Sequence, residues 1–361
     1  MNRPTPARAI AHQISRPMAI CIAAHYFYKP YSLQRIFSFI RHLVSDIVAL
    51  TLWPAIVMFF AALGTSATAA EAADANSGAV LAARYLALKP QLDDSPFKRP
   101  LHMSSGESSA SVNGEIHAVF NHPFATLGSA LNQAAQWCEI LILHPNTKYC
   151  RASNERADGT TSGPTTTILN VAIGRKGQQA LNDAYSVNFG YRVISNSRDF
   201  LQIRLSAEKG PLSTRNYRIV LEAIPLENGK SFVRMAYSYD FGFSGRVAMQ
   251  AYLGTVGRNK SGFTVIGKSP NGQPQYVGGM RGLVERNTMR YYLAIESFMG
   301  ALSTPAPARI EKSLRDWFAA SERYPLQLHE IDQDEYLDMK RTEYRRQQSA
   351  VLAATRMAAV E

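Results

Sequence analysis

The chain lacks the sequence motifs of the common catalytic centres. It contains no G-x-S-x-G, H-E-x-x-H or G-x-G-x-x-G string, so nothing indicates a hydrolase nucleophile elbow, a zincin helix or a dinucleotide loop. The histidines are scattered along the chain, and a cysteine pair is not accompanied by further ligands at zinc-like spacing. The sequence therefore predicts no catalytic residue, no metal site and no cofactor.

Two short strings match catalytic motifs but lack the structural context that those motifs need. Gly262–Ser269 has the letters of a P-loop, yet its middle residues favour a strand and Pro270 follows, where a P-loop requires a helix. Ser95-Pro96-Phe97-Lys98 fits S-x-x-K, but Pro96 opposes the helix on which that motif lies. We interpret both as chance matches.

The chain also lacks a basic run with interleaved aromatics, which argues against a nucleic-acid partner. Lys and Arg number 39 against 28 Asp and Glu, a net charge of +11. Residues 1–69 hold six basic residues and one acidic residue, so the remainder has 33 against 27, a net of +6. This modest excess gives weak support for an anionic partner, such as lipid head groups at a membrane surface.

Charge is absent from Ile47 to Gly64, and this stretch predicts export. Arg35 and Arg41 precede it and the small residues 65–70 follow, which is the order of a secretory signal. We expect cleavage between about Ala70 and Ala73, with 1–72 as leader and a periplasmic or secreted location. An uncleaved anchor in the inner membrane through residues 47–64 is the alternative, because the run is long enough to span a bilayer.

Cysteine is scarce, with only three in the chain, and Cys21 lies in the leader. The exported part keeps Cys138 and Cys150, twelve residues apart. In an oxidising compartment this pair is expected to form a disulfide. Two buried free thiols are the alternative.

Residues 73–110 are expected to hold a short helix, Ala79–Leu88, and a polar connector. The core is expected from 111 to 302. It begins with a strand over Gly114–Phe120, a helix from Pro123 to Trp137 and a short apolar strand over Ile140–Leu143.

After a polar loop over 158–166, apolar and polar residues alternate in five successive segments. They begin at about residues 167, 185, 201, 217 and 233. Such alternation predicts an antiparallel sheet with one buried and one wet face, and Asn228-Gly229 predicts a hairpin turn. The wet face repeats arginine at Arg192, Arg204, Arg218 and Arg234. These side chains form either a basic surface for anionic lipid or a solvated face paired with Glu222 and Asp240.

Beyond the sheet we expect a helix over 245–255, a strand over 262–266, a glycine-rich loop over 267–282 and a long helix over Leu283–Leu302. Periodicity assigns the long helix a buried stripe that includes Tyr291, Ile295 and Phe298. The charged side chains of Glu285, Arg286, Arg290 and Glu296 are assigned to its other side. Pro305 and Pro307 end this helix, and 303–361 is expected to add two further helices.

This order of elements, over about Val112–Leu302, resembles the START-like (SRPBCC) helix-grip superfamily. The resemblance implies an α+β fold in which a curved antiparallel sheet wraps a long C-terminal helix, with an apolar cavity between them. The segments Trp137–Cys150 and Tyr276–Arg290 are also similar to a group of exported bacterial proteins of unknown function. Residues 245–282 and the extra C-terminal helices depart from a minimal helix-grip domain and could fill the cavity.

Several tyrosines fall in the inward register of the predicted sheet: Tyr185, Tyr191, Tyr217, Tyr237 and Tyr239. A buried tyrosine hydroxyl needs a hydrogen-bond partner, so a partly wet pocket for an amphipathic ligand is one interpretation. A filled core is the other. In the first case we expect the ligand to contact Tyr191, Tyr237, Tyr239, Tyr291 and Phe298.

Three functions are compatible with these patterns. The first is an exported protein that binds a lipid-like small molecule. The second is an enzyme on the same fold, cyclase- or hydrolase-like, that would use Tyr237, Tyr239 or Arg290. The third is a non-enzymatic envelope interaction protein that uses its C-terminal helices. The sequence favours a binding protein over an enzyme and indicates neither the ligand nor the oligomeric state.

Overall fold

The computed structural model describes residues 77–156, 165–255 and 260–358. The chain divides into two units, residues 1–69 and 70–361, and every described element belongs to the second. The predicted leader, its apolar run over 47–64 and the expected cleavage positions lie outside the described residues. Among the helices of the described part, none is long and apolar enough to cross a membrane.

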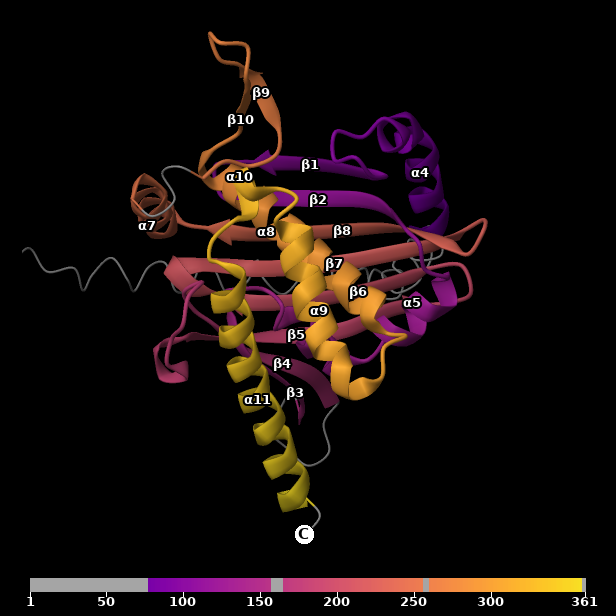
Figure 1. Ribbon diagram of the computed structural model, residues 1–361, viewed down its shortest axis with the longest axis vertical. Coiled ribbons are helices and arrows are strands. Elements are labelled where there is room, and N and C mark those ends of the chain that lie inside the picture. Colours follow the sequence, from indigo (N-terminus) through magenta and orange to yellow (C-terminus); the bar gives the residue numbers. More distant parts are fainter. Residues whose placement is uncertain (1–76, 157–164, 256–259, 359–361) are drawn as a thin grey trace, which may run out of the picture. The chain divides into compact units, whose positions relative to one another are not determined.

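The centre of this unit is an eight-stranded sheet with the order β1-β2-β8-β7-β6-β5-β4-β3 (Figure 1). Every neighbouring pair is antiparallel. The strands are β1 (Leu101–Glu107), β2 (Ser111–Phe120), β3 (Thr147–Arg156), β4 (Thr165–Ile173), β5 (Tyr185–Asn196), β6 (Leu201–Lys209), β7 (Thr214–Leu226) and β8 (Lys230–Phe241). A separate hairpin joins β9 (Val265–Lys268) to β10 (Pro274–Tyr276).

The sheet forms where the alternation of apolar and polar residues predicts it. Along β8, Val233, Met235 and Tyr237 are buried, whereas the residues between them are only half-buried. The hairpin between β7 and β8 turns at Asn228 and Gly229, whose φ angles are 58° and 67°. Two consecutive positive φ angles define the type I′ turn that asparagine and glycine favour.

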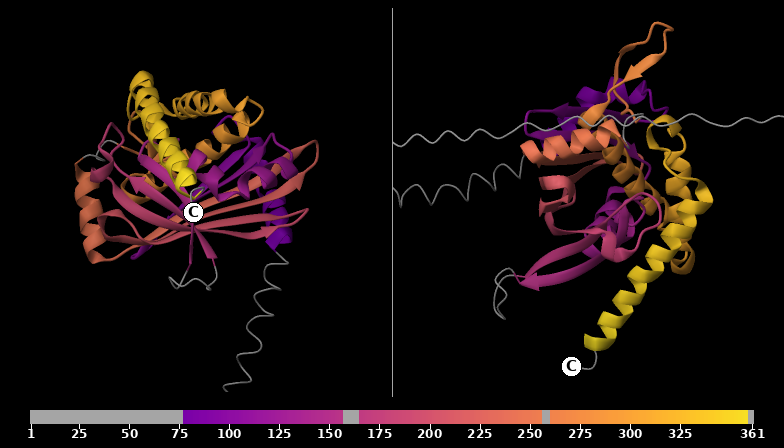
Figure 2. Two further views of the ribbon diagram at one scale, coloured as in Figure 1. Left: turned by 90° about the horizontal axis from the view of Figure 1, so that it is seen from below. Right: turned by 90° about the vertical axis from the view of Figure 1, so that its left-hand side faces the viewer.

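Most helices cover one face of the sheet (Figure 2). The helices are α4 (Ser77–Asp93), α5 (Phe124–Leu131), α6 (Ala134–Leu141), α7 (Phe243–Gly254), α8 (Gly279–Ala301), α9 (Ala306–Ser321), α10 (Pro325–Leu328) and α11 (Gln333–Ala358), with short 3₁₀ turns at Leu181–Asp183 and Pro211–Ser213. Helix α8 packs against β1, β2 and β8, α9 packs on α8, and α11 packs against β3 and α9.

Two hydrophobic clusters lie on opposite faces of the sheet. Val233 belongs to the large cluster under α8. Its neighbour Phe232 belongs to a small cluster with Leu81 and Leu88 of α4. Since successive side chains of a strand point to opposite faces, α4 covers part of the face away from α8. The predicted fold class is therefore confirmed: the fold is α+β, with a curved antiparallel sheet wrapped on a long helix and extra C-terminal helices.

Several predicted elements were wrong in detail. The polar connector contains β1, an edge strand paired to β2. Its polar residues do not show the alternation by which strands were predicted. Residues 140–143 are not a strand, because α6 continues to Leu141 and a turn follows. The helix predicted from Pro123 to Trp137 is two helices, and Thr147–Arg156 is a strand that the sequence analysis did not assign.

The predicted polar side of the long helix was also wrong. Glu285, Arg286 and Arg290 of α8 are fully buried rather than solvated. The Glu285 carboxylate accepts hydrogen bonds from the backbone N–H groups of Phe263 and Thr264. Periodicity assumes one wet face, but α8 lies between the sheet and other segments, so its charged residues form buried bonds instead.

The P-loop-like string has no phosphate-binding geometry. Its residues enter the β9–β10 hairpin, and no helix follows Ser269. Gly262 lies against α8, where an added Cβ would stand 2.9 Å from the Cα atom of Gly282. This close approach of two backbones requires a glycine, which explains the residue without phosphate binding.

Candidate functional site

Four tyrosines meet between the sheet and α8. Tyr217 on β7 stacks on Tyr239 of β8, with ring centroids 5.2 Å apart. Tyr237 of β8 lies 5.8 Å from Tyr239 and 5.4 Å from Tyr291 of α8. We call these four residues the tyrosine cluster.

The hydroxyl groups of the tyrosine cluster differ in their partners. Tyr217 shares a 2.6 Å hydrogen bond with the Thr214 hydroxyl. Burial raises the pKa of the Tyr237 hydroxyl, and the Asn287 side chain opposes this shift. The Tyr239 hydroxyl is buried, and no described residue hydrogen-bonds to it. A buried donor without a partner costs free energy, so this position favours a polar group from outside the protein.

His144 extends the cluster with a second such atom. Its ring stacks on Tyr291 with centroids 4.9 Å apart. The Nδ1 atom accepts a 3.1 Å hydrogen bond from the Asn146 backbone N–H, so we assign the proton to Nε2. Nε2 is buried and has no partner within the described part of the chain.

Burial determines the protonation of this region. It raises the pKa of the Tyr217 hydroxyl to about 12 and shifts the pKa values of Tyr237, Tyr239 and Tyr291 upward in the same direction. Burial, followed by the positive charges of Arg290 and Lys340, lowers the pKa of His144 well below its usual value. At neutral pH these groups are uncharged, so they can bind a polar group but do not provide a charged acid or base.

The structure brings together three of the five expected ligand residues. Tyr237, Tyr239 and Tyr291 belong to the cluster. Tyr191 lies toward Trp137, and its hydroxyl donates a 3.0 Å hydrogen bond to the Leu131 carbonyl. Phe298 is buried on α8, seven residues beyond Tyr291, which is about 10 Å along the helix.

Two residues near the tyrosine cluster differ from the sequence-based expectation, Tyr185 and His144. Tyr185, expected to face inward, is 43% exposed at the start of β5. His144 was not assigned to the site because it belongs to a turn after α6, where no periodicity indicates which way a side chain points.

A cavity of about 580 Å³ opens beside the C-terminal half of α8. Val119, Phe120 and Ala320 provide apolar walls, and Glu296, Ser297 and Gly300 line it from α8. It therefore lies between the end of β2, α8 and α9, and we call it the α8 cavity. Its volume is in the range of small-molecule sites. No tyrosine of the cluster lines it.

Charged side chains surround the α8 cavity. Arg99 pairs with Glu296 and donates a 2.6 Å hydrogen bond to the Tyr292 hydroxyl. Asp316 pairs with Lys312 at 2.6 Å. Lys230 and Arg323 also line the cavity, and neither has an ion-pair partner in the described residues. The cavity thus combines apolar walls with a rim of excess positive charge.

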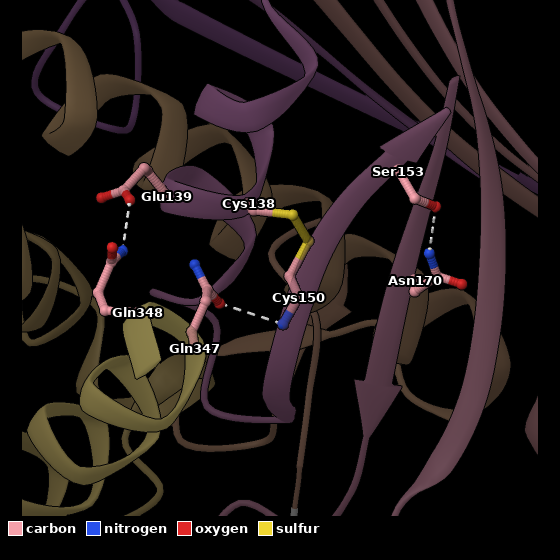
Figure 3. Close-up of a disulfide and its surroundings, with 7 residues drawn as sticks. All are labelled: Cys138, Glu139, Cys150, Ser153, Asn170, Gln347 and Gln348. Carbon is pink, nitrogen blue, oxygen red and sulfur yellow. Dashed lines mark hydrogen bonds between the residues drawn. A yellow bond between two sulfur atoms is a disulfide. The ribbon is translucent and has the colours of Figure 1, made fainter. Parts of the chain in front are cut away.

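The expected disulfide is present between Cys138 of α6 and Cys150 of β3, with Cα atoms 5.1 Å apart (Figure 3). The Gln347 side chain of α11 accepts a 3.1 Å hydrogen bond from the Cys150 backbone N–H. Gln348 donates a 3.2 Å hydrogen bond to Glu139. The disulfide therefore ties α6 to the edge strand β3, and α11 is hydrogen-bonded to both elements.

The arginines of the outer face are not alike. Arg234 pairs with Glu115 and, at 2.8 Å, with Glu222. Arg192, Arg204 and Arg218 are exposed, and Arg192 lies directly opposite Arg204 in the register of β5 and β6. Of the two alternatives for this face, Arg234 therefore fits the one in which arginines pair with acidic residues.

Histidine, cysteine, aspartate and glutamate side chains do not gather into a group that could hold a metal ion anywhere in the described residues.

Comparison with known proteins gave matches among solved structures alone. No family model and no curated protein matches the chain. It is similar to norcoclaurine synthase from Thalictrum flavum, at 10% identity over 42% of this chain and 91% of that one, with a TM-score of 0.28. It is similar to a conserved protein from Geobacillus kaustophilus, at 13% identity over 52% and 95%, with a TM-score of 0.28.

It is also similar to human StAR-related lipid transfer protein 5, at 9% identity over 48% of this chain and 84% of that one, with a TM-score of 0.25. A StAR-related lipid transfer protein, of the superfamily named in the sequence analysis, thus occurs among the matches. At these scores the fold rests on the strand order and register described above.

Proposed function

We propose that the protein binds a lipid-like, amphipathic small molecule between the sheet and α8. The observation that carries this proposal is the α8 cavity, with about 580 Å³ of space, apolar walls and a rim that includes Lys230 and Arg323. Apolar walls favour the transfer of a hydrocarbon tail out of water. Cations at the rim favour an anionic head group that remains close to solvent.

The tyrosine cluster is the second part of the proposal. Tyr237, Tyr239 and Tyr291 lie between the same two layers, and the Tyr239 hydroxyl and His144 Nε2 are buried without partners in the described chain. A polar group of the ligand could satisfy either of these donors. Tyr191 and Phe298 mark the outer limits of this proposed contact region.

We propose binding rather than catalysis. The tyrosines and His144 are uncharged at neutral pH, and the single lone pair of His144 that could accept a proton is used by the Asn146 N–H. General acid–base catalysis works best with a group whose pKa lies near the working pH. The cluster is better suited to orient a ligand than to move protons.

The cavity can be tested by filling it. Gly300 lines the cavity, and a Cβ added there meets nothing within 4 Å. Gly300→Leu should therefore fold normally and occupy the space of the tail. Gly254→Leu in α7 is the matched control, because its added Cβ also meets nothing within 4 Å and it does not line the cavity.

The measurement is a titration with a fluorescent fatty acid, together with thermal melting of each variant. We expect saturable binding to the wild type, at least tenfold weaker binding to Gly300→Leu and unchanged binding to Gly254→Leu. Equal affinity of all three proteins, or no saturable binding to the wild type, would contradict the proposal.

We also propose that the protein acts outside the cytoplasm. The leader pattern supports export, and the disulfide between Cys138 and Cys150 is the kind of bond that persists in oxidising compartments. N-terminal sequencing of protein recovered from the cell envelope should begin between Ala70 and Ala73. A sequence that begins at Met1 or Met18 would instead support the membrane anchor.

A further inference from the structure

A second cavity, of about 360 Å³, lies between α11 and the segment that follows β4. Its lining includes Arg175, Gln178 and Gln179 from that segment and Thr342, Glu343 and Arg346 from α11. We call it the α11 cavity. Its walls offer guanidinium and amide donors rather than the apolar surfaces of the α8 cavity.

Two buried lysines lie beneath this cavity and share its carboxylate. Lys148 contacts one Glu343 oxygen at 3.0 Å, and Lys340 donates to the other at 2.8 Å. The side chains of both lysines are fully buried. Lys148 also donates to the carbonyls of Pro145 and Gly177. Glu343 is thus already engaged by two cations and leaves the arginines of the cavity unneutralised.

Arg346 and Arg175 are those arginines. The Nη1 atom of Arg346 is buried and has no hydrogen-bond partner in the part of the chain that the structure describes. Arg175 is exposed, and its backbone N–H holds the Gln179 side chain at 2.7 Å. The positive charges of both arginines act on Lys148, where they add to burial in lowering the pKa of its ammonium group.

The charges around the cavity do not balance. Four cations lie in or beneath the cavity, against the single carboxylate of Glu343: Lys148, Lys340, Arg175 and Arg346. Glu335, whose carboxylate lies beside Gly177, is exposed in the first turn of α11, and counting it still leaves an excess of two cations. Clustered cations with an unpartnered buried donor are destabilising unless an anion neutralises them.

We propose that the α11 cavity binds a small oxyanion of the phosphate class, either free phosphate or the phosphate of a larger molecule. Arg346 and Arg175 would supply planar, charged donors, which recognise phosphate through paired N–H groups. The side-chain amides of Gln178 and Gln179 would supply neutral donors. This site is separate from the α8 cavity, so it does not depend on the proposed function.

The test is a calorimetric titration of the protein with inorganic phosphate, at an ionic strength held constant with sodium chloride. We expect saturable binding to the wild type and at least tenfold weaker binding to Arg346→Gln. Arg175→Gln should also weaken binding, because it removes the other charged donor. Since Arg175 is exposed, this variant covers the case in which Arg346→Gln fails to fold. Arg192→Gln, on the outer face of the sheet, is the matched control and should bind as the wild type does.

Vesicles that contain phosphatidic acid distinguish the two sources of the phosphate group. Binding of vesicles by the wild type that is lost in Arg346→Gln and Arg175→Gln would identify a lipid head group. Binding of inorganic phosphate without vesicle binding would identify a free phosphate. Absence of saturable binding to either, or equal affinity of the wild type and both arginine variants, would overturn the proposal.

Discussion

The α8 cavity and the α11 cavity differ in walls and in charge, although helices border both. The α8 cavity has apolar walls, and its two carboxylates, Glu296 and Asp316, are each paired with a cation. The α11 cavity has polar walls, and its one carboxylate, Glu343, is shared by two lysines. Arg175 and Arg346 in its lining have no carboxylate partner among the described residues. The fold therefore offers one place suited to hydrocarbon and another suited to a small anion.

The difference determines how each site should respond to salt. Binding driven by apolar burial depends little on ionic strength, whereas binding to exposed charges weakens as salt screens them.

The largest expected effect comes from removing the buried carboxylate. Glu343→Gln leaves Lys148 and Lys340 buried without a counter-charge. Breaking a buried ion pair in this way costs about 3–5 kcal/mol. Urea unfolding should show that loss, while fatty-acid binding at the α8 cavity persists under folding conditions.

Glu335→Gln is the control for this variant, because Glu335 is exposed in the first turn of α11. Its loss should cost no more than about 1 kcal/mol, the value of an acidic side chain at a helix N-terminus. Similar losses for the two variants would mean that the Glu343 network is not a buried one.

The disulfide should contribute the next largest effect. Its cysteines are twelve residues apart, and closing a loop of that size stabilises a protein by about 3 kcal/mol in the chain-entropy model. The double variant Cys138→Ala/Cys150→Ala should lose about that much in urea unfolding. An unchanged midpoint in the variant would show that α6 and β3 hold together without the bond.

Acid should destabilise the protein through two buried histidines, His144 beneath α8 and His117 on the opposite face. Burial lowers the pKa of His117 to about 4 and lowers that of His144 as well. In the unfolded chain both titrate near pH 6.5. Above that pH both histidines are neutral in the folded and the unfolded chain, so their titration does not change the free energy of unfolding.

Below pH 6.5 the unfolded chain binds protons that the folded chain does not, so stability falls by up to about 1.4 kcal/mol per pH unit for each histidine. Urea unfolding at pH 7.5, 6.0 and 5.0 measures the slope. His117→Leu should make this slope shallower, because it removes one of the two titrating groups. It breaks no described hydrogen bond, since both His117 ring nitrogens are buried without partners in the described chain. The same slope in this variant would exclude His117 as a source.

The smallest expected effect compares two tyrosines of the cluster. Tyr239→Phe removes a hydroxyl without a described partner and should leave the free energy of unfolding unchanged or raise it by about 1 kcal/mol. Tyr217→Phe removes a hydroxyl that is bonded to Thr214 and should lower it by about 1 kcal/mol. Changes of the same sign would show that the two hydroxyl groups have similar surroundings.

The same pair sharpens the proposed ligand contact. If the Tyr239 hydroxyl binds the ligand, Tyr239→Phe should weaken fatty-acid binding while it leaves the fold intact. Equal retention of the fatty acid by Tyr239→Phe and the wild type would remove Tyr239 from the site.

The sequence predicts the sheet well because its signal is local. Six strands, the Asn228-Gly229 turn and the long helix follow from alternation, turn chemistry and periodicity within short windows. The polar edge strand β1 escapes because its residues do not alternate and its pairing with β2 is a tertiary contact.

The candidate site is less predictable, because its features depend on what packs from far along the chain. The register places Tyr237 and Tyr239 on the inner face, but the contact with Tyr291 and the stacking of His144 need the folded arrangement of α8. Arg290 was assigned to a solvated side, whereas its guanidinium donates a 2.6 Å hydrogen bond to Glu330 from a fully buried position. Cavities leave no periodic signal at all.

Native mass spectrometry of the protein isolated from the cell envelope without detergent shows whether a lipid-like molecule occupies the α8 cavity. We expect an adduct of lipid-like mass on the wild type and on Gly254→Leu, and its loss from Gly300→Leu. A wild-type mass equal to that of the polypeptide alone, both on isolation and after incubation with a lipid extract, would contradict this expectation.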